Sequence, residues 1–325
     1  MRPYKSFLAS EMEDYLQYRS KNLGYKTMPA RYHLLKFDDY LRKTDAGWHS
    51  LTPSFFLGMR AGLTMEARGI NAIFSSIRSF FRFLAGRGYV GHNPLRDIPR
   101  LKKNVVVPFV FSPDQIDLLL KSVSKNIRTT NGCFLTDLAI YMVVLVMARC
   151  GTRISEPIKL LRCNYRRDDA TLYIERTKFG KDRIIPIPKK VVAEIENYLA
   201  VRQTLRPNDK NPYLFAGREE RSLSGNTVRV AFDKAVSDMG LKQSRKVLGN
   251  VSFNRPTPHS LRHSFAVNTL NRIRKSGGSA QNALPILAAY LGHTDYICTS
   301  VYLRVSDAMS RKNLVDFCLW QRVNK

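Results

Sequence analysis

The sequence predicts a mostly α-helical protein with a small β-hairpin or sheet, divided into two domains. At 325 residues the chain is long for a single domain, which typically has about 150 residues. Apolar residues make up 44% of it, which is enough for buried cores and argues against a disordered chain. Apolar side chains recur three and four residues apart along most of its length, a spacing typical of helices that pack through one face.

Four helices are predicted in the first part of the chain. Their apolar residues keep helical spacing over Phe7–Leu23, Ala30–Arg42, Ser54–Arg68 and Ile70–Gly86. Aromatic rings in the last helix can stack on nucleic-acid bases, but their helical spacing favours packing in a core. This stripe consists of Ile73, Phe74, Ile77, Phe80, Phe81 and Leu84. We therefore expect residues 1–104 to form a helical domain.

A segment rich in prolines and basic residues follows. Twenty residues hold four prolines, Pro94, Pro99, Pro108 and Pro113, and a basic run that contains Arg100, Lys102 and Lys103. Prolines at this density favour an extended chain. We place the domain boundary near residue 105 and interpret residues 105–113 as a basic linker, either a surface loop or a strap across a nucleic-acid backbone.

Residues 114–325 are predicted to form a mixed α+β domain. Ser112 followed by Pro113 has the form of a helix start, and the apolar run of Leu135–Cys150 indicates a buried central helix. Two strands, Leu172–Arg176 and Arg183–Ile187, flank a turn at 179–182 and predict a β-hairpin. Further helices are predicted at 189–203, 226–239, 258–275, 284–291 and, in the tail, about 306–320.

The chain is strongly basic. It has 53 Lys and Arg against 26 Asp and Glu, a formal charge of +27. Such an excess destabilises a compact state, so it indicates a polyanionic partner. Residues 1–107 hold 18 basic and 8 acidic residues, and the rest of the chain holds the other 35 and 18. Both halves would therefore attract phosphate, as expected of a protein that grips DNA from two sides.

Other classes of protein are disfavoured. The longest apolar run, Leu138–Ala148, is too short to span a bilayer, and no secretion signal follows the N-terminus. The five cysteines are scattered without a CxxC pair, which argues against a disulfide framework or zinc ribbon and fits a reducing cytosol. His259 and His263 have zinc-like spacing, but a third ligand is missing. We expect no metal, no cofactor and no membrane partner.

Four short segments carry chemically active residues. They are Gly151-Thr152-Arg153-Ile154-Ser155-Glu156, Thr177-Lys178-Phe179-Gly180-Lys181, Pro258-His259-Ser260-Leu261-Arg262-His263, and Leu291-Gly292-His293 with Tyr302 nine residues after the histidine. In the third segment His259 and Arg262 are three apart and share one face of a helix. They lie near its N-terminus, which favours anions, so the sequence predicts a phosphate site there.

Together these segments resemble the tyrosine recombinase (phage integrase) family. The family pattern is Arg, Lys, His-x-x-Arg, His and Tyr in that order, and it matches Arg153, Lys178, His259, Arg262, His293 and Tyr302. The resemblance covers residues 110–305 by motif, and it implies that the N-terminal helices clamp DNA. The chain departs from the pattern at Pro157, at Leu303-Arg304 and in the long basic loop Leu241–Pro256.

The resemblance implies a role for each residue. Tyr302 attacks a DNA phosphate and forms a 3′-phosphotyrosine, which keeps the bond energy for resealing. Arg153 and Arg262 clamp the non-bridging oxygens. Lys178 is the general acid, with Lys181 as its competitor, and His259 is the base. His293 donates a hydrogen bond to the phosphate.

Further residues are given supporting roles. Glu156 is expected to orient Arg153 or His259, and His263 to pack beside Arg262. Contacts to DNA are expected from Lys181, Arg183, Arg100, Lys102 and Lys103.

The expected function is site-specific recombination. Two molecules would bind double-stranded DNA at an inverted repeat, and two such dimers would form a tetramer that exchanges strands through a Holliday junction in the cytoplasm, associated with the nucleoid. The tail helix packs either on a neighbour or on its own subunit. A type IB topoisomerase and a non-catalytic DNA-binding regulator are the alternatives, and the target site, the direction of reaction and a phage, transposon or chromosomal role stay open.

Overall fold

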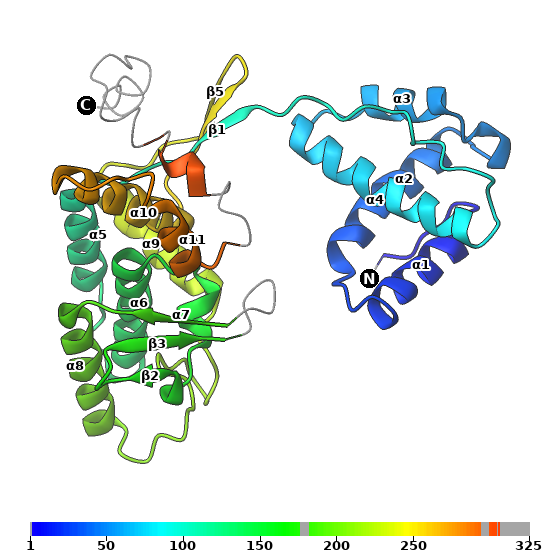
Figure 1. Cartoon of the computed structure of the whole chain (residues 1–325). Coiled ribbons are helices and arrows are strands. Elements are labelled where there is room, and N and C mark those ends of the chain that lie inside the picture. The colour runs from blue at the N-terminus through cyan, green and yellow to red at the C-terminus, as the bar shows by residue number, and fades with distance from the viewer. Residues whose placement is uncertain (1, 176–181, 294–298, 304, 306–325) are drawn as a thin grey trace. The chain divides into compact units, whose positions relative to one another are not determined.

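The chain divides into two structural units. The computed structural model describes residues 2–175, 182–293, 299–303 and 305. Chain contacts separate Met1–Val105 from Val106–Lys325 (Figure 1). The fold class predicted from the sequence, mostly helical with small sheets, is confirmed.

The first unit consists of four helices and one 3₁₀ turn. They are α1 (Ala9–Lys21), α2 (Met28–Lys43), η1 (Trp48–Ser50), α3 (Pro53–Ala61) and α4 (Ala67–Gly86). All four predicted helices exist, but α3 ends at Ala61 rather than at Arg68. The helix stops because Gly62 caps it and the chain then turns, with the N–H of Met65 donating to the carbonyl of Leu63.

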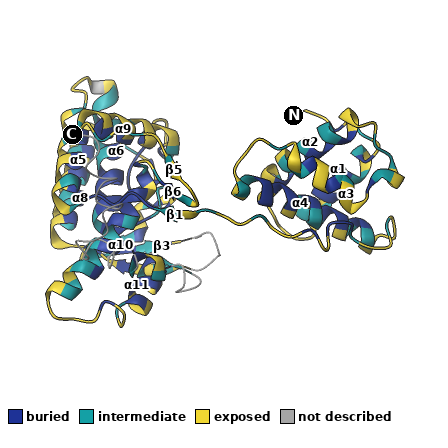
Figure 2. Ribbon diagram, turned by 90° about the horizontal axis from the view of Figure 1, so that it is seen from above, coloured by how far each residue is buried: buried dark blue, intermediate teal, exposed yellow. Residues whose placement is uncertain are grey.

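The core of this unit is built on α4. All six residues of its predicted apolar stripe are buried, so the rings pack inside the unit (Figure 2). Phe81 lies edge-on to both Phe37 and Phe56. After α4 the chain is fixed to the same helix, because Arg78 donates to the carbonyls of Leu95 and Ile98 at 3.1 and 2.9 Å.

The segment expected to be a basic linker has a different structure. Residues Val105–Val107 form strand β1, and Phe109, Val110 and Phe111 are buried in the second unit. Burying these apolar side chains stabilises the fold, whereas an extended linker would leave them exposed to water. The exposed basic side chains Arg100, Lys102 and Lys103 precede this segment and belong to the first unit.

Helices form most of the second unit. They are α5 (Pro113–Lys125), α6 (Asn131–Cys150), α7 (Ser155–Lys159), η2 (Arg162–Asn164), α8 (Lys189–Leu205), α9 (Gly225–Asp238), α10 (Pro258–Lys275) and α11 (Leu284–Leu291). α6 contacts α5, α8, α9 and α10, as expected of a central helix. Its residues Gly132–Cys150 are long and apolar enough to cross a membrane by composition, but most of this span is buried in the unit, which accounts for its hydropathy.

Two small three-stranded sheets complete the second unit. The first has the order β2-β3-β4, formed by Tyr165–Arg166, Thr171–Ile174 and Arg183–Pro186. Its strands β3 and β4 are the predicted hairpin, paired with Leu172 opposite Ile185. The second sheet has the order β1-β6-β5, with β5 at Lys246–Leu248 and β6 at Val251–Phe253. It lies partly in the basic loop 241–256, for which the sequence predicted no strand.

Candidate active site

The site lies where α6 and α11 end and α10 begins. Both α6 and α11 end in a left-handed glycine, Gly151 with φ 61° and Gly292 with φ 66°. A Cβ on Gly151 would lie 2.4 Å from the ring of Phe265, closer than any real contact. Glycine is therefore required there both for the backbone conformation and for the approach of α10.

Three arginines donate to the carbonyls that these helix ends leave free. Arg183 donates through Nε to Tyr290 at 2.8 Å, and Arg153 through Nη2 to Gly292 at 3.2 Å. Arg262 donates to Leu291 and, at 3.0 Å, to Gly151. The C-terminal carbonyls of a helix carry partial negative charge, which favours cations. Three guanidinium groups from different segments of the chain thus converge on one place.

Glu156 connects two of these arginines. Its carboxylate accepts from Nη1 of Arg153 at 3.0 Å and from Nη2 of Arg183 at 2.9 Å. Burial raises the pKa of Glu156, but the hydrogen bond and charge of Arg183, followed by weaker contributions from Arg153 and Arg262, outweigh this and hold the pKa below its usual value. The ionised carboxylate therefore fixes Arg153, which is one of the two contacts expected of it.

Arg183 does not lie where a DNA-binding surface residue would lie. Only 10% of its side chain is exposed, and its guanidinium is bonded to Glu156 and to the end of α11. The first residue of β4 points toward α11, a direction that the sequence pattern alone does not give. In this structure Arg183 makes its contacts within the site, and its contact with DNA stays a prediction.

Arg262 is fully buried yet keeps an unused donor. Its Nη atoms donate to carbonyls, but its Nε–H has no hydrogen-bond partner among the described residues. Burial and, after it, the positive charge of Arg153 lower the pKa of Arg262 to about 10. A buried cation with an unused N–H is costly unless an anion binds it. This is the arrangement expected of a phosphate clamp.

Two histidines contact Tyr302, and a third packs against one of them. Nδ1 of His263 lies 3.0 Å from the tyrosine Oη. The ring centroids of His259 and His263 are 4.5 Å apart, and the ring of His293 stacks on Tyr302 with centroids 6.2 Å apart. Nδ1 of His293 is also 2.8 Å from Oγ1 of Thr299. The sequence placed His263 beside Arg262 in a supporting role, whereas the structure brings it to Tyr302.

The histidines are held neutral. Burial is the main cause, followed by nearby positive groups such as Arg262, and together they lower the pKa of His263 to about 3 and that of His293 to about 4. The pKa of His259 is lowered for the same reasons, although part of its side chain is exposed. A neutral imidazole has one nitrogen that accepts and one that donates a hydrogen bond.

Tyr302 belongs to a short helical segment, residues 299–303, and only 3% of its surface is exposed. It packs in an apolar cluster with α10 and α11 residues, among them Ala266, Leu270 and Leu291. Its ring is therefore fixed by packing while its hydroxyl faces His263.

Most of the second unit matches a known protein family in sequence. The model of the phage integrase family matches residues 110–309, more than half of the chain. The chain belongs to the phage integrase family. It is a tyrosine recombinase, an enzyme type that breaks and rejoins DNA.

Relatives of this family extend the match to the first unit. A Sinorhizobium fredii protein, the integrase/recombinase y4rB, is 24% identical over 302 residues, covering 93% of this chain and 94% of that protein. The tyrosine recombinase XerD of Brucella suis is 26% identical over 251 residues, covering 77% and 74%. Similarity over most of each chain is consistent with a common two-part organisation.

Solved structures of the family share the fold. The XerH recombinase bound to a palindromic difH substrate, in a post-cleavage complex, has a TM-score of 0.69 at 17% identity, covering 96% of this chain and 84% of that one. A lambda integrase tetramer bound to a Holliday junction has a TM-score of 0.62 at 18% identity, covering 89% and 77%.

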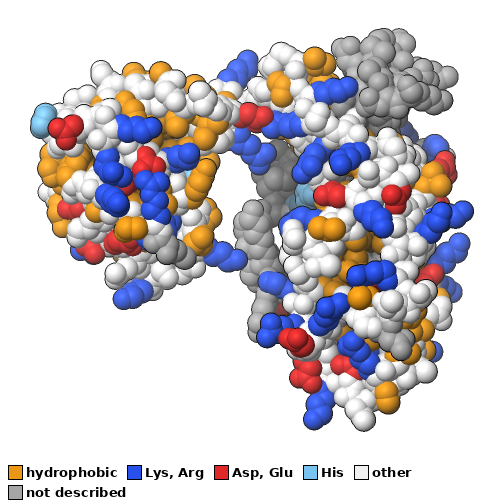
Figure 3. All heavy atoms as spheres, turned by 180° about the vertical axis from the view of Figure 1, so that it is seen from behind, with side chains coloured by type: hydrophobic (Ala, Val, Ile, Leu, Met, Phe, Trp, Pro, Cys, Tyr) orange, Lys and Arg blue, Asp and Glu red, His pale blue; other side chains and the backbone are white. Residues whose placement is uncertain are grey.

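Some residues expected in this phage integrase site fall outside the described part of the chain. Lys178 and Lys181 fall in 176–181, outside the described residues, as does the predicted tail helix. Within the described ranges, no group of three or more His, Cys, Asp or Glu side chains is placed to hold a metal ion. Lys and Arg side chains are spread over the visible face of each unit (Figure 3).

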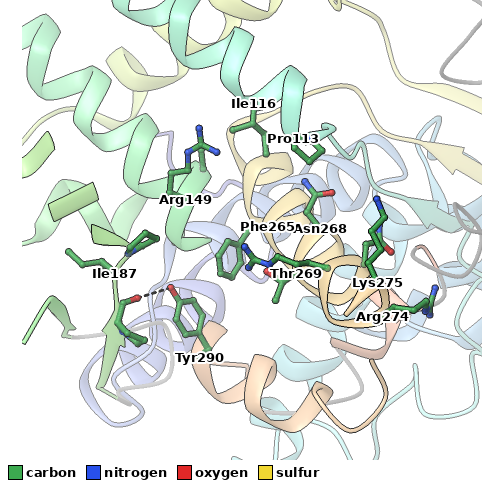
Figure 4. Close-up of a pocket in the computed structure, with 15 residues that line it drawn as sticks. Pro113, Ile116, Arg149, Ile187, Phe265, Asn268, Thr269, Arg274, Lys275 and Tyr290 are labelled. Carbon is green, nitrogen blue, oxygen red and sulfur yellow. Dashed lines mark hydrogen bonds between the residues drawn. The ribbon is translucent and has the colours of Figure 1, made fainter. Parts of the chain in front are cut away.

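A cavity of about 1000 Å³ opens between α6, β4, α10 and α11 (Figure 4). The stacked rings of Phe265 and Tyr290 line it, and Oη of Tyr290 donates to the carbonyl of Pro186 at 3.3 Å. Of the expected catalytic side chains that the structure describes, none lines this cavity, so it is separate from the arginine and histidine cluster.

Proposed function

We propose that the protein is a site-specific DNA recombinase that cuts and rejoins DNA through a 3′-phosphotyrosine intermediate. The observation that carries the proposal is the meeting of Tyr302 with histidines from α10 and the end of α11, next to the buried Arg262. A hydroxyl, neutral imidazoles and a guanidinium with an unused N–H form a set suited to phosphoryl transfer.

The proposed reaction assigns one task to each group. Arg153 and Arg262 bind the two non-bridging oxygens of the scissile phosphate, on which negative charge grows in the transition state. Tyr302 attacks phosphorus, and the 5′-oxygen leaves with a proton from Lys178. His259 and His293 donate hydrogen bonds to the same phosphate. Because the phosphotyrosine keeps the bond energy, the free 5′-hydroxyl of another strand can attack it without ATP.

We propose double-stranded DNA with an inverted repeat as the partner. The formal charge of +27 and the exposed Arg100, Lys102 and Lys103 favour binding to the phosphate backbone. Proteins similar in fold were solved on a palindromic substrate and as a tetramer on a Holliday junction. By analogy we propose a dimer on each site and a tetramer at synapsis, acting at the nucleoid in the cytoplasm.

The test begins by finding a binding site. The Tyr302→Phe protein is used to select tight binders from a pool of random-sequence DNA duplexes, and the selected site is rebuilt as duplexes with a nick beside each possible cleavage position. Wild-type protein is expected to form a covalent adduct with one of these nicked duplexes, seen as a protease-sensitive band in a denaturing gel. Specific binding without any adduct would indicate a DNA-binding regulator instead.

The topoisomerase alternative has its own test. A recombinase is expected to leave a supercoiled plasmid without the selected site unrelaxed and to exchange strands between two duplexes that carry it. Relaxation of the plasmid lacking the site, without strand exchange, would favour a type IB topoisomerase.

A further inference from the structure

We propose that His263 is a catalytic residue, which takes the proton of Tyr302 as the tyrosine attacks DNA. The proposal deepens the function proposed above and rests on it. Nδ1 of His263 lies 3.0 Å from Oη of Tyr302, within the range of a direct hydrogen bond. The sequence assigned this task to His259, one helical turn earlier.

The position of His263 follows from the helix. His259 and His263 are four residues apart on α10, so their rings lie on one face, and the rings touch edge to face at 4.5 Å. The side chain nearer the C-terminus reaches the helical segment 299–303, where it meets Tyr302. His259 is exposed at the start of the helix, where a bound phosphate can approach it.

The hydrogen bond has a definite direction if His263 is neutral. Among the described residues, the groups that face it are the hydroxyl of Tyr302, the rings of His259 and His293 and the guanidinium of Arg262. Burial and these neighbours lower the pKa of His263 to about 3, so the ring carries one proton near pH 7. With that proton on Nε2, Nδ1 accepts from the tyrosine O–H.

The same neighbouring groups make the basicity of His263 depend on whether DNA is bound. In the free protein the low basicity of His263 makes it a weak acceptor for the proton of the tyrosine. A DNA phosphate bound by Arg153 and Arg262 would place negative charge beside the ring and raise its basicity. The proton acceptor is then strong only when the scissile phosphate is in place.

In the proposed cleavage step one proton leaves the tyrosine and another reaches the departing oxygen of the DNA. The O–H bond of Tyr302 breaks and its proton moves to Nδ1 of His263, while the Oη–P bond forms and the P–O5′ bond breaks. The departing O5′ takes a proton from the ammonium group of Lys178. In resealing, the 5′-hydroxyl returns its proton to Lys178 and attacks phosphorus, and His263 returns its proton to the tyrosine oxygen.

The experiment measures single-turnover adduct formation on the nicked duplex defined above. His263→Ala is expected to slow the reaction about 100-fold or more, as is typical of losing a general base. The Kd for DNA, measured in the Tyr302→Phe background, is expected to change less than twofold. Added imidazole is expected to restore part of the rate, because a free imidazole can occupy the space of the lost side chain. His92→Ala, an exposed histidine of the first unit, is the matched control.

Two further measurements separate a base from a packing residue. His263→Gln keeps a hydrogen-bonding side chain of similar size and serves if the alanine variant unfolds. Its rate is expected to be about 100-fold low and independent of pH over the range in which the wild-type rate rises with pH. A duplex with sulfur at the bridging 5′ position, which needs no acid for its leaving group, is expected to restore Lys178→Ala and not His263→Ala.

The outcomes against the proposal are distinct. Adduct formation by both His263 variants at the wild-type rate would overturn it, and so would rescue of His263→Ala by the sulfur-bridged duplex, which would place His263 at the leaving group. If the wild-type protein forms no adduct with any selected duplex, the proposed function itself fails and the question of its base does not arise.

Discussion

Two buried arginines of the second unit differ in what surrounds them. Arg202 on α8 is 1% exposed and Arg262 on α10 is 0% exposed. Arg202 donates through Nε to Asp209 at 2.7 Å and through its other nitrogens to three backbone carbonyls. Arg262 has two carbonyl partners, an unused Nε–H among the described residues and Arg153 as a positive neighbour.

The difference predicts a structural role for Arg202 and, under the proposed function, an anion-binding role for Arg262. The two side chains are equally buried, so burial alone does not distinguish them. Around Arg202 the charge is neutralised and every nitrogen is paired, so the guanidinium has nothing left to bind. Around Arg262 one donor is unused among the described residues, and the carboxylate of Glu156 offsets only part of the positive charge of Arg153 and Arg183, so an anion from outside would complete the site.

The largest effect expected in the Arg262 region comes from Tyr302→Phe. The ring would still pack in the same apolar cluster, so folding and DNA affinity are retained, but the nucleophilic oxygen is gone. Adduct formation on the nicked duplex should fall below detection, with binding by gel shift unchanged. Residual adduct at the wild-type position would remove Tyr302 from the mechanism.

Arg262→Gln tests the clamp directly. Loss of one preorganised donor to a growing negative charge typically costs about 100- to 1,000-fold in rate. Adduct formation should fall by this amount, while the free energy of unfolding changes less than for the same substitution at Arg202. Equal loss of stability at both positions, with the rate unchanged, would erase the distinction between the two arginines.

Arg202→Gln is the matched counterpart. It leaves Asp209, whose side chain is 8% exposed, without its main partner, and breaking a buried ion pair in this way typically costs about 3–5 kcal/mol. Urea unfolding should show this loss, whereas the adduct rate per folded molecule should stay at the wild-type value. A rate defect larger than the folding defect would mean that Arg202 also serves the reaction.

Acid should destabilise the two regions in different pH ranges. The pKa values of His263 and His293 are lowered to about 3 and about 4 in the folded protein, so between pH 6.5 and 4 the unfolded chain binds protons that the folded chain does not. Stability is complete above about pH 6.5 and falls below it, by about 1.4 kcal/mol per pH unit for the buried His263 and by less for the more exposed His293, whose charge solvent screens. His263→Gln should remove its share of this slope in denaturation curves recorded from pH 7 to 4.5.

The Arg202 region should respond at lower pH. Burial raises the pKa of Asp209, but the hydrogen bond from Arg202 outweighs it, and the pKa is lowered overall. The stability that this carboxylate contributes is present above about pH 3.9 and is lost only as pH falls further. Asp209→Asn should therefore leave the slope between pH 6.5 and 4.5 intact, and a change of slope in that range would contradict the assignment.

The smallest effect is expected from Lys102, an exposed lysine that is not neutralised by any ion pair among the described residues. Lys102→Gln should weaken DNA binding to all sequences alike and reduce the slope of log K against log salt by about 0.9. Titrations at several salt concentrations measure this slope. An unchanged slope would show that Lys102 does not contact phosphate.

The parts of the molecule that sequence predicts well are those set by local signals. Serine and proline at the start of α5 and the helical spacing of apolar residues in α4 placed these two helices closely. The order of Arg153, Arg262 and Tyr302 along the chain identified the family, which the match over residues 110–309 confirmed. These features depend on residues that lie near one another in sequence or on a fixed order.

The parts that sequence missed depend on distant pairing and side-chain direction. The sheet of β1, β5 and β6 joins three-residue strands from residues 105–107 and 246–253, too short and too far apart to leave a pattern. The sequence does not show that the side chain of Arg183 points toward α11, because that direction is set by tertiary packing. His263 had one available signal, its position four residues after His259, which places both rings on one face of α10.

The two glycines that end α6 and α11 set a limit on how this site can change. In a library that samples every amino acid at each position, Gly151 should tolerate almost nothing, since even alanine would meet the ring of Phe265. Gly292 should behave similarly, because a methyl group there would lie 3.0 Å from the guanidinium of Arg183. Recombinases engineered from this scaffold for new DNA targets would therefore have to draw their diversity from other surfaces, leaving these two positions untouched.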